Sequence, residues 1–204
     1  MPTPSHSQPI PTTWFSRCAT AVAPDLLGCW LVRRFPNGLI ARGLIVETEA
    51  YTPNDPAMHA YRRRTARNSV MFGPAGITYV YLIYGMYHCL NVVTDQDGTP
   101  SAVLIRALQL DPIPTWIDLK RDKPHRIAAG PGKLCRALQI DLNHTAQPLV
   151  PERGLWLEHR TPQFQMDLER GAIAFTQTTR IGLTQGVELP WRWYLPDCNA
   201  VSKK

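Results

Sequence analysis

Short stretches of alternating hydrophobic and polar residues recur along the first half of the chain, which is the pattern of half-buried β-strands. Residues 29–51, CWLVRRFPNGLIARGLIVETEAY, read as two such strands joined by a Pro-Asn-Gly turn, a strong hairpin signal. Residues 77–83 alternate in the same way, the phase breaks at Tyr84, and residues 87–94 read as a returning strand. After the turn DQDGTP, residues 101–108 form a further predicted strand. Tyr84 is therefore expected at the tip of a hairpin.

Helical patterns are fewer and shorter. Residues 12–28 begin with an N-cap threonine, are interrupted at Pro24 and stop near Gly28. Residues 114–122 (PTWIDLKRD) and 133–140 (KLCRALQI) read as short helices. Three later stretches read as strands: GLWLEHR, AIAFT and WRWYL. This mixture of hairpins and helices predicts an α+β fold built on an antiparallel sheet.

The chain reads as one globular unit with a short tail. Residues 1–12 are rich in Pro, Ser and Thr and predict a flexible N-terminal tail. No repeat, low-complexity block or linker divides residues 13–204, which predict a single domain, and 44% hydrophobic residues can bury a sizeable core. The start lacks the pattern of a signal peptide, and no apolar run approaches the ~20 residues of a membrane helix. A membrane protein is therefore not expected.

The pattern of cysteines and histidines argues against two kinds of site. Five cysteines are present, no two of them form a CxxC pair, and no histidines have HxxxH or HxH spacing. A disulfide framework and a zinc site are therefore not expected. We expect a protein of a reducing compartment, namely a bacterial cytoplasm in association with the nucleoid, or the nucleus if the source is eukaryotic.

Charge and aromatic residues indicate the kind of partner. Lys and Arg number 22 against 16 Asp and Glu, giving a net charge of +6, which favours an anionic partner such as nucleic acid. Four arginines fall within residues 62–67, and residues 76–93 carry four tyrosines. A tyrosine in a core needs a partner for its hydroxyl, whereas a tyrosine on a surface can stack on a base.

The stretch LIVETEAY, residues 44–51, carries two carboxylates on one predicted strand. Alternation places Leu44, Val46, Thr48 and Ala50 on one face, and Ile45, Glu47, Glu49 and Tyr51 on the other. Strand interiors disfavour acids, so this second face has two interpretations. It is an exposed face with solvated glutamates, or it is a site in which a carboxylate beside an aromatic wall acts as a general base.

Two further polar residues interrupt apolar strands. Arg106 lies within SAVLIRAL and needs a partner, for which Glu47 and Glu49 are the available acids. Such a pair is structural, or it holds a water against the carboxylate. Asn91 lies within CLNVV, where a hydrogen-bonded core amide is the simpler interpretation.

Taken together, these motifs resemble the alkyladenine (3-methyladenine) DNA glycosylase family. The resemblance runs from LLGCWLVRRFPNG through VETEAY, RNSVMFGPAGITYVYLIYGMYHCLNV and LIRAL to GPGKLCRAL, and is weaker at TRIGL and AVS near the end. It implies a single mixed domain with a curved, open-barrel-like antiparallel sheet surrounded by helices. It also implies excision of alkylated or deaminated purines from double-stranded DNA by hydrolysis of the N-glycosidic bond, by a monomer without metal or cofactor.

The resemblance also implies roles for individual residues. Glu49 resembles the general base that activates water, with Arg106 and the carbonyl of Val201 as further partners of that water. The remaining residues fall into three groups: pocket walls at Tyr51, His59 and Tyr81, a filter for the purine 2-position at Asn91, and a wedge into the duplex at Tyr84. Phosphate contacts are expected from Arg64, Arg67 and Lys133, the last at the helix entry GPGKL.

Two other functions compete with this interpretation. A glycosidase or transferase acting on free sugars or nucleosides would use two carboxylates, but residues i and i+2 of one strand point in parallel and cannot flank a bond from opposite sides. A non-catalytic nucleic-acid-binding protein that stacks tyrosines on bases explains the charge and the aromatic residues, but gives no reason for Glu49 beside an anionic ligand.

Overall fold

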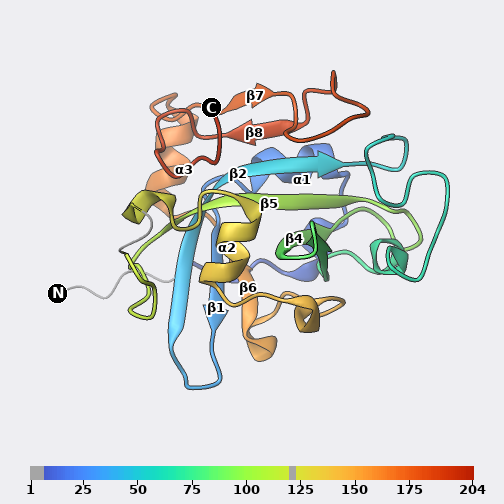
Figure 1. The fold of residues 1–204 in the computed structure, drawn as a ribbon. Helices are drawn as coiled ribbons and strands as arrows, with labels where there is room; N and C mark the ends of the chain where they lie inside the picture. Colours follow the sequence, from blue (N-terminus) through green and yellow to red (C-terminus); the bar gives the residue numbers. More distant parts are fainter. Residues whose placement is uncertain (1–6, 120–122) are drawn as a thin grey trace.

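The computed structural model describes residues 7–119 and 123–204 (Figure 1). Within these residues, eight strands form one antiparallel sheet in the order β3-β4-β5-β2-β1-β6, and β8 pairs with both β2 and β7. The strands are β1 Trp30–Arg34, β2 Ile40–Tyr51, β3 Thr78–Ile83, β4 Tyr87–Val93, β5 Ala102–Leu110, β6 Leu155–Glu158, β7 Thr176–Thr178 and β8 Arg192–Tyr194. The long strand β2 runs through the bend of the sheet, which curls into a half-barrel.

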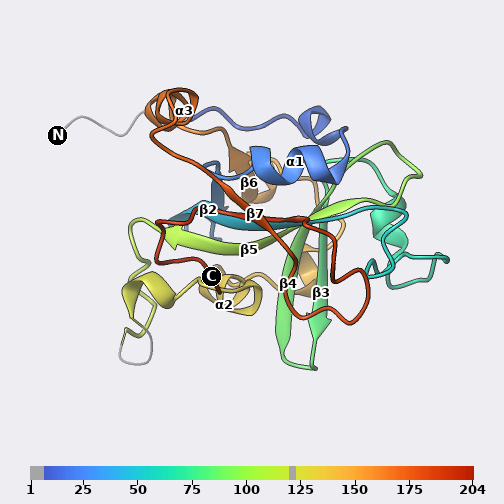
Figure 2. The same ribbon diagram turned by 90° about the horizontal axis from the view of Figure 1, so that it is seen from above.

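Three α-helices of the described residues pack around this sheet: α1 Ala19–Asp25, α2 Pro131–Ala137 and α3 Pro162–Glu169. Helices α1 and α3 lie on one side, whereas α2 and the β3–β4 hairpin lie on the other (Figure 2). The predicted α+β fold, a single mixed domain on a curved antiparallel sheet, is confirmed. In the described part of the chain, no helix has the length and apolar character needed to cross a membrane.

The main hydrophobic core lies between α1 and the sheet. Side chains from the sheet and from the residues that flank α1 are at most 1% exposed: Phe15, Leu26, Ile45, Ile105 and Leu108. Burying one such side chain contributes about 1.5–3 kcal/mol. A second cluster contains Met58, Met71 and Tyr79, with Tyr51 and Tyr81 packed against it, so one side of this smaller core is aromatic.

The two predicted hairpins are confirmed. The β1–β2 turn is closed by Gly38, whose φ of 82° is accessible to glycine without strain. In the β3–β4 turn, Tyr84 and Gly85 both have positive φ, 52° and 68°, and the N–H of Met86 donates to the carbonyl of Ile83 at 3.2 Å. Positive φ at both central positions defines the type I′ turn, which matches the twist of the flanking strands. Tyr84 therefore lies at the tip of a hairpin, in a tight hydrogen-bonded turn.

The pairing of β2 with β5 changes register twice beside the two glutamates, and it skips Val46 on one strand and Arg106 on the other. A bulge of this kind changes which face the neighbouring side chains occupy. Ile45 consequently packs in the main core, and the predicted grouping of Ile45 with the two glutamates is wrong. Val46 packs in a cluster on the other side of the sheet, whereas the hydroxyl of Thr48 donates to a carbonyl of α1.

The N-terminal segment packs more tightly than its composition predicts. Residues 1–6 of the predicted tail lie outside the described residues. Ile10 is 2% exposed, and its N–H donates to the carbonyl of Leu157 at 2.8 Å, because β6 offers an edge to pair with and a gap for one apolar side chain. The predicted helix over residues 12–28 is split into a 3-10 helix, Thr12–Phe15, and α1.

Several predictions for the second half of the chain were wrong. Residues 114–119 form turns, not a helix, and residues 120–122 of that prediction lie outside the described residues. The strand predicted for AIAFT, residues 172–176, overlaps the observed strand only at its last residue, because β7 spans Thr176–Thr178. Helix α3 was not predicted, although Thr161 marks its start by accepting a hydrogen bond from the N–H of Phe164 at 3.2 Å. In each case the local pattern is short, and tertiary packing decides the structure.

Candidate active site

Both glutamates of β2 are completely buried. The interpretation of this face as exposed, with solvated glutamates, is therefore wrong. The Oε1 of Glu49 accepts from the backbone N–H of Ile181 at 2.8 Å and lies 3.1 Å from Nη1 of Arg106. Its Oε2 accepts from the hydroxyl of Tyr51 at 2.8 Å. The carboxylate is thus fixed at both oxygens by groups from three separate segments.

Glu47 makes a different set of contacts. Its Oε1 accepts from Nε of Arg106 at 3.1 Å and from Nε of Arg192 at 2.7 Å. Both the backbone N–H and the hydroxyl of Ser202 donate to this carboxylate, at 2.7 and 2.9 Å. Glu47 therefore joins β2, β5, β8 and the C-terminal segment, which is the arrangement of a structural clamp.

Arg106 lies between the two glutamates and confirms the expected pairing. Burial alone would lower the pKa of its guanidinium, but the carboxylates of Glu49 and Glu47 outweigh burial, and the pKa is raised above its ordinary value. The group is therefore a permanent cation. Because pairing with β2 skips this residue, the bulge on β5 lets its side chain reach both carboxylates.

An aromatic pocket adjoins the carboxylates. Its lining consists of Tyr51, Ala57, Met58, His59, Met71, Tyr79, Tyr81 and Asn91. The rings of His59 and Tyr81 meet edge to face with centroids 4.4 Å apart. The cavity among these side chains is about 30 Å³, which is room for about one water molecule. The aromatic side chains of this pocket therefore pack closely against one another.

The titrating groups of this pocket are neutral near pH 7. Burial, together with the nearby charge of Glu49, raises the pKa of Tyr51 well above its ordinary value. Burial, together with the nearby charge of Arg67, lowers the pKa of His59, whose Nδ1 lies 3.1 Å from the hydroxyl of Tyr79. A neutral wall accepts a cationic ring without charge repulsion.

Asn91 lies at the edge of this pocket, on β4 directly opposite Tyr79 of β3. It is 4% exposed, and its Nδ2 donates to the carbonyl of Tyr79 at 3.0 Å. The structure therefore gives Asn91 both the features of a hydrogen-bonded core amide and a place in the pocket lining.

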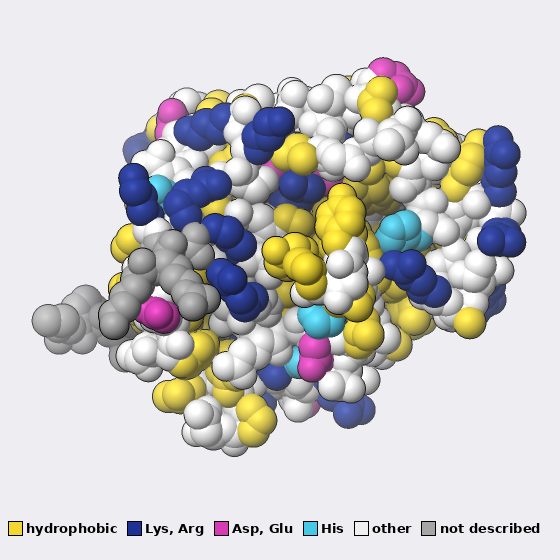
Figure 3. Space-filling model, viewed as in Figure 1, with side chains coloured by type: hydrophobic (Ala, Val, Ile, Leu, Met, Phe, Trp, Pro, Cys, Tyr) yellow, Lys and Arg dark blue, Asp and Glu magenta, His cyan; other side chains and the backbone are white. Residues whose placement is uncertain are grey.

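The tip of the β3–β4 hairpin is the most exposed apolar part of the described surface. Tyr84 is 79% exposed and Met86 65%. In the space-filling view, hydrophobic side chains gather over this hairpin, and Lys and Arg side chains lie on both sides of it (Figure 3). This is the surface that an anionic ligand would meet together with a protruding aromatic ring.

The three predicted phosphate contacts have different surroundings. The exposed guanidinium of Arg64 lies 5.2 Å from the ring centre of Phe72. Nη2 of the exposed Arg67 donates to the carbonyl of Leu82 at 3.0 Å, next to the hairpin. Nζ of Lys133, on α2, donates to the carbonyl of Arg126 at 3.4 Å. Arg67 is thus tied to strand β3, which leads to Tyr84 at the hairpin tip.

The C-terminal segment contributes more to the site than its sequence indicates. Residues missed from the sequence contact the two glutamates or their neighbours: Asp55, Arg180, Ile181, Arg192 and Ser202. Arg192 carried a visible signal, since it interrupts the strand-like run WRWYL as Arg106 interrupts its own strand. The carbonyl of Val201 accepts from Nη1 of Arg126 at 2.7 Å.

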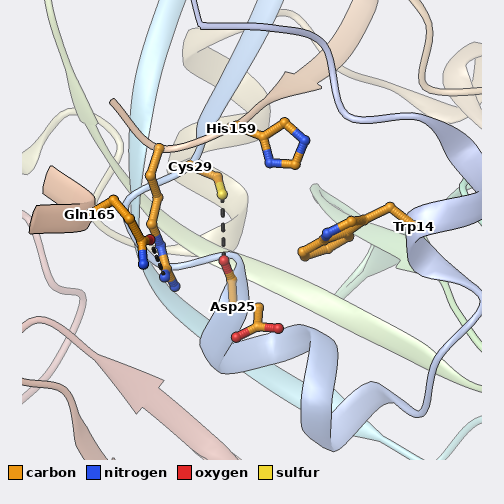
Figure 4. Close-up of a pocket in the computed structure, with 6 residues that line it drawn as sticks. Trp14, Asp25, Cys29, His159 and Gln165 are labelled. Atoms are coloured by element: carbon orange, nitrogen blue, oxygen red, sulfur yellow. Dashed lines mark hydrogen bonds between the residues drawn. The ribbon is translucent and has the colours of Figure 1, made fainter. Parts of the chain in front are cut away.

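A larger hollow of about 350 Å³ lies beside α1 and α3, on the side of the sheet away from the hairpin (Figure 4). Four of its side chains, those of Asp25, Cys29, Arg160 and Gln165, bond to one another or to nearby residues. Asp25 pairs with Arg17 at 2.8 Å, and its carbonyl accepts from the thiol of Cys29 at 3.4 Å. Arg160 donates to the side-chain oxygen of Gln165 at 3.3 Å. These four side chains thus find partners within the protein, and the paired carboxylates with their aromatic walls remain the candidate site.

No group of three or more His, Cys, Asp and Glu among the described residues could hold a metal ion. The candidate site itself offers a buried carboxylate, a fixed arginine and a set of neutral aromatic rings.

Comparison with known proteins agrees with this geometry. Residues 13–199 match the methylpurine-DNA glycosylase family. A protein of Trichodesmium erythraeum is 57% identical over 98% of this chain and 100% of its own length. A protein of Synechococcus sp. (strain JA-3-3Ab) is 57% identical over 93% of this chain and 96% of its own length. A protein of Carboxydothermus hydrogenoformans is 45% identical over 96% of this chain and 99% of its own length. All three are provisionally named 3-methyladenine DNA glycosylases.

These matches define the class of protein as a DNA glycosylase, a hydrolase of N-glycosidic bonds in DNA. More particularly, the chain belongs to the methylpurine-DNA glycosylase family.

Proposed function

We propose that this protein removes alkylated and deaminated purines from double-stranded DNA by flipping the nucleotide into the aromatic pocket and hydrolysing its glycosidic bond with a water activated by Glu49. The damaged purines that we propose as substrates are of the class of 3-methyladenine, 7-methylguanine, hypoxanthine and ethenoadenine. The observation that carries the proposal is that Tyr51 both lines the pocket and donates to Glu49, which joins the base-binding wall directly to a buried carboxylate. We further propose that the protein acts as a monomer, without a cofactor, in a bacterial cytoplasm.

Flipping needs a side chain that compensates for lost stacking. Extruding a nucleotide from a duplex costs a few kcal/mol, and one stacked aromatic ring is worth roughly 1–3 kcal/mol. Tyr84 stands 79% exposed at the hairpin tip, in a hydrogen-bonded turn, so its ring protrudes far enough to enter the vacated space. Such wedges enter from the minor groove and bend the duplex.

For a cationic alkylated purine, the chemical step follows from the charge of the damaged base. An alkylated purine such as 3-methyladenine is cationic, so the neutral tyrosine faces attract it and it leaves easily with the electrons of the glycosidic bond. The sugar becomes oxocarbenium-like, the water oxygen bonds to its anomeric carbon, and Glu49 takes the proton of that water. Arg106, fixed between the two glutamates, helps to orient the water against Glu49.

The test is base release from defined duplexes under single-turnover conditions, with hypoxanthine, ethenoadenine and 7-methylguanine in turn. Release from duplex and not from the free nucleosides is the expected result. Tight binding without release would support a non-catalytic DNA-binding protein, and release from nucleosides alone would support a sugar-directed hydrolase or transferase.

We expect no covalent enzyme–DNA adduct. A water nucleophile leaves an abasic site, whereas a lysine nucleophile would form a Schiff base that borohydride reduces to a stable link. Borohydride added during turnover should trap no protein on the DNA, and the abasic strand should stay uncut until alkali is added. A trapped species on a denaturing gel would contradict the proposed mechanism.

Asn91→Ser is expected to gain excision of guanine opposite thymine while retaining excision of hypoxanthine. Guanine differs from hypoxanthine by the 2-amino group, and a polar group placed to clash rejects such a small addition better than an apolar wall does. Shortening Asn91 makes room for that group, and we expect guanine release to rise by about tenfold or more where a mismatch makes flipping easier.

The measurement is single-turnover release from duplexes with guanine or hypoxanthine opposite thymine. Because Nδ2 of Asn91 donates to the carbonyl of Tyr79, the variant must also be compared with the wild type in thermal unfolding. Loss of hypoxanthine release without any gain on guanine would mean that Asn91 supports the sheet and that the filter lies elsewhere.

A further inference from the structure

We propose that Arg180 is a positioning residue of the active site, which supports the pocket wall Tyr51 from outside the pocket and delivers the neighbouring N–H of Ile181 to Glu49. The inference rests on the roles proposed above for Tyr51 and Glu49. Arg180 lies in TRIGL, where the resemblance to the family is weaker, and the sequence alone assigns it no role.

The guanidinium of Arg180 is fully buried, with no exposed side-chain surface. It forms a two-pronged ion pair with the carboxylate of Asp55, in which Nη2 lies 2.8 Å from Oδ1 and Nη1 bonds to Oδ2. Nη1 also donates to the carbonyl of Ala50 at 3.0 Å, and Nη2 to that of Gly186 at 3.2 Å. One side chain thus ties together the end of β2, the loop that follows it and the segment before β8.

The plane of this guanidinium meets aromatic rings. Its central carbon lies 4.6 Å from the ring centre of Tyr51 and 5.3 Å from that of Trp191. Tyr51 lines the aromatic pocket, whereas Arg180 does not, so the contact comes from outside the cavity. A planar cation can support a ring in this way and still keep its four hydrogen bonds, because its donors point outward in its own plane.

The residue after Arg180 reaches the reacting carboxylate. The N–H of Ile181 donates to Oε1 of Glu49 at 2.8 Å, and the hydroxyl of Tyr51 donates to Oε2. A shift of the chain at Arg180 would therefore move one hydrogen bond directly and the other through the ring of Tyr51. One hydrogen bond to each oxygen of Glu49 therefore depends on the placement of this guanidinium.

Stability alone gives a weak reason for such a pair. Desolvation makes buried ion pairs poor contributors to folding, and apolar residues of similar volume often replace them without loss. The fit is nevertheless tight, since a Cβ added at Gly186 would lie 3.0 Å from Oδ1 of Asp55 and 3.1 Å from Nη2 of Arg180. Close fitting around a charged pair, directly behind a base-binding wall, favours a positioning role.

The test compares Arg180→Lys with Arg42→Lys. Arg42 is the matched control, because it also lies largely buried, pairs with a carboxylate, that of Glu158, and faces a ring, that of Trp30 at 5.3 Å. Each variant is measured for affinity to a duplex with hypoxanthine and to the same duplex with a tetrahydrofuran abasic analogue. The analogue has no base to place against Tyr51, and the ratio of the two affinities does not depend on the folded fraction.

Arg180→Lys keeps the charge but loses the two-pronged pair and the planar contact. We expect its preference for hypoxanthine over the abasic analogue to fall by roughly 2- to 30-fold, the range of one cation–π contact. Single-turnover release should fall by about tenfold or more through the misplaced Glu49. Arg42→Lys should match the wild type in this affinity preference and in the rate of release.

The double variant Asp55→Asn, Arg180→Gln serves if Arg180→Lys fails to fold, because it leaves no unpaired charge buried. The same loss of preference is expected for it. If the wild type releases hypoxanthine, and the Arg180 variant has the same affinity ratio and release rate as Arg42→Lys, the inference is overturned and the proposed function is left intact. Absence of release by the wild type would instead overturn the proposed function.

Discussion

Glu49→Gln is expected to lower the single-turnover rate of base release by about 100-fold or more, with binding to lesion duplex retained. The amide keeps the shape of the carboxylate but cannot take a proton from water. The surroundings accommodate it: the amide oxygen can stay with the N–H of Ile181 and with Arg106, and the amide nitrogen can donate to the hydroxyl of Tyr51. The loss should therefore fall on the chemical step and not on folding.

Glu47→Gln provides the comparison. Each oxygen of Glu47 accepts from fixed donors, including the backbone N–H of Ser202 at Oε2, so an amide nitrogen there would face another donor. We expect this variant to lose stability, seen as a lower melting temperature, because a buried donor without an acceptor costs about 1–3 kcal/mol. Near-normal release by Glu49→Gln, together with loss of release by Glu47→Gln, would transfer the role of general base to Glu47.

Tyr84→Ala is expected to weaken affinity for lesion duplex by roughly 1–3 kcal/mol, the value of one stacked aromatic ring. Tyr84 is 79% exposed, so its removal takes little from the folded protein. Tyr84→Phe keeps the ring and should bind like the wild type. Dissociation constants from fluorescence anisotropy, at one fixed salt concentration, provide the measurement.

Leu39→Ala is the matched control for this wedge, because Leu39 is also a large exposed hydrophobic residue in a hairpin turn, that between β1 and β2. Its affinity for lesion duplex should equal that of the wild type. An unchanged dissociation constant for Tyr84→Ala would mean that Tyr84 is ordinary hairpin surface.

The hairpins were predictable because their signals are local. Alternation of period two, a Pro-Asn-Gly turn and the phase break at Tyr84 each specify structure within a few residues. The pairing of Arg106 with the glutamates of β2 was also predictable, since a cation in an apolar strand needs an acid and only two were near. These features supplied the sheet and the centre of the site.

The features that could not be predicted depend on residues far apart in the chain. The bulges at Val46 and Arg106 leave the alternation of the sequence intact, so nothing in LIVETEAY shows that Ile45 faces away from Glu47. Asp55 and Arg180 lie in loops 125 positions apart, and neither loop has a periodic pattern. The clamp of Ser202 on Glu47 spans 155 positions. Such contacts are decided by tertiary packing, which a local pattern does not encode.

The burial of the charged cluster at Glu47 has a consequence for how the reaction responds to ionic strength. Glu47, Glu49, Arg106 and Arg192 are each at most 8% exposed and face one another, two anions against two cations. Dissolved ions screen exposed charges over about 8 Å at physiological concentration, but they screen buried pairs far less. Capture of DNA through exposed arginines releases counterions and weakens steeply with added salt. Salt should therefore act on capture and leave the hydrolytic step nearly untouched, so that raising the sodium chloride concentration separates the two.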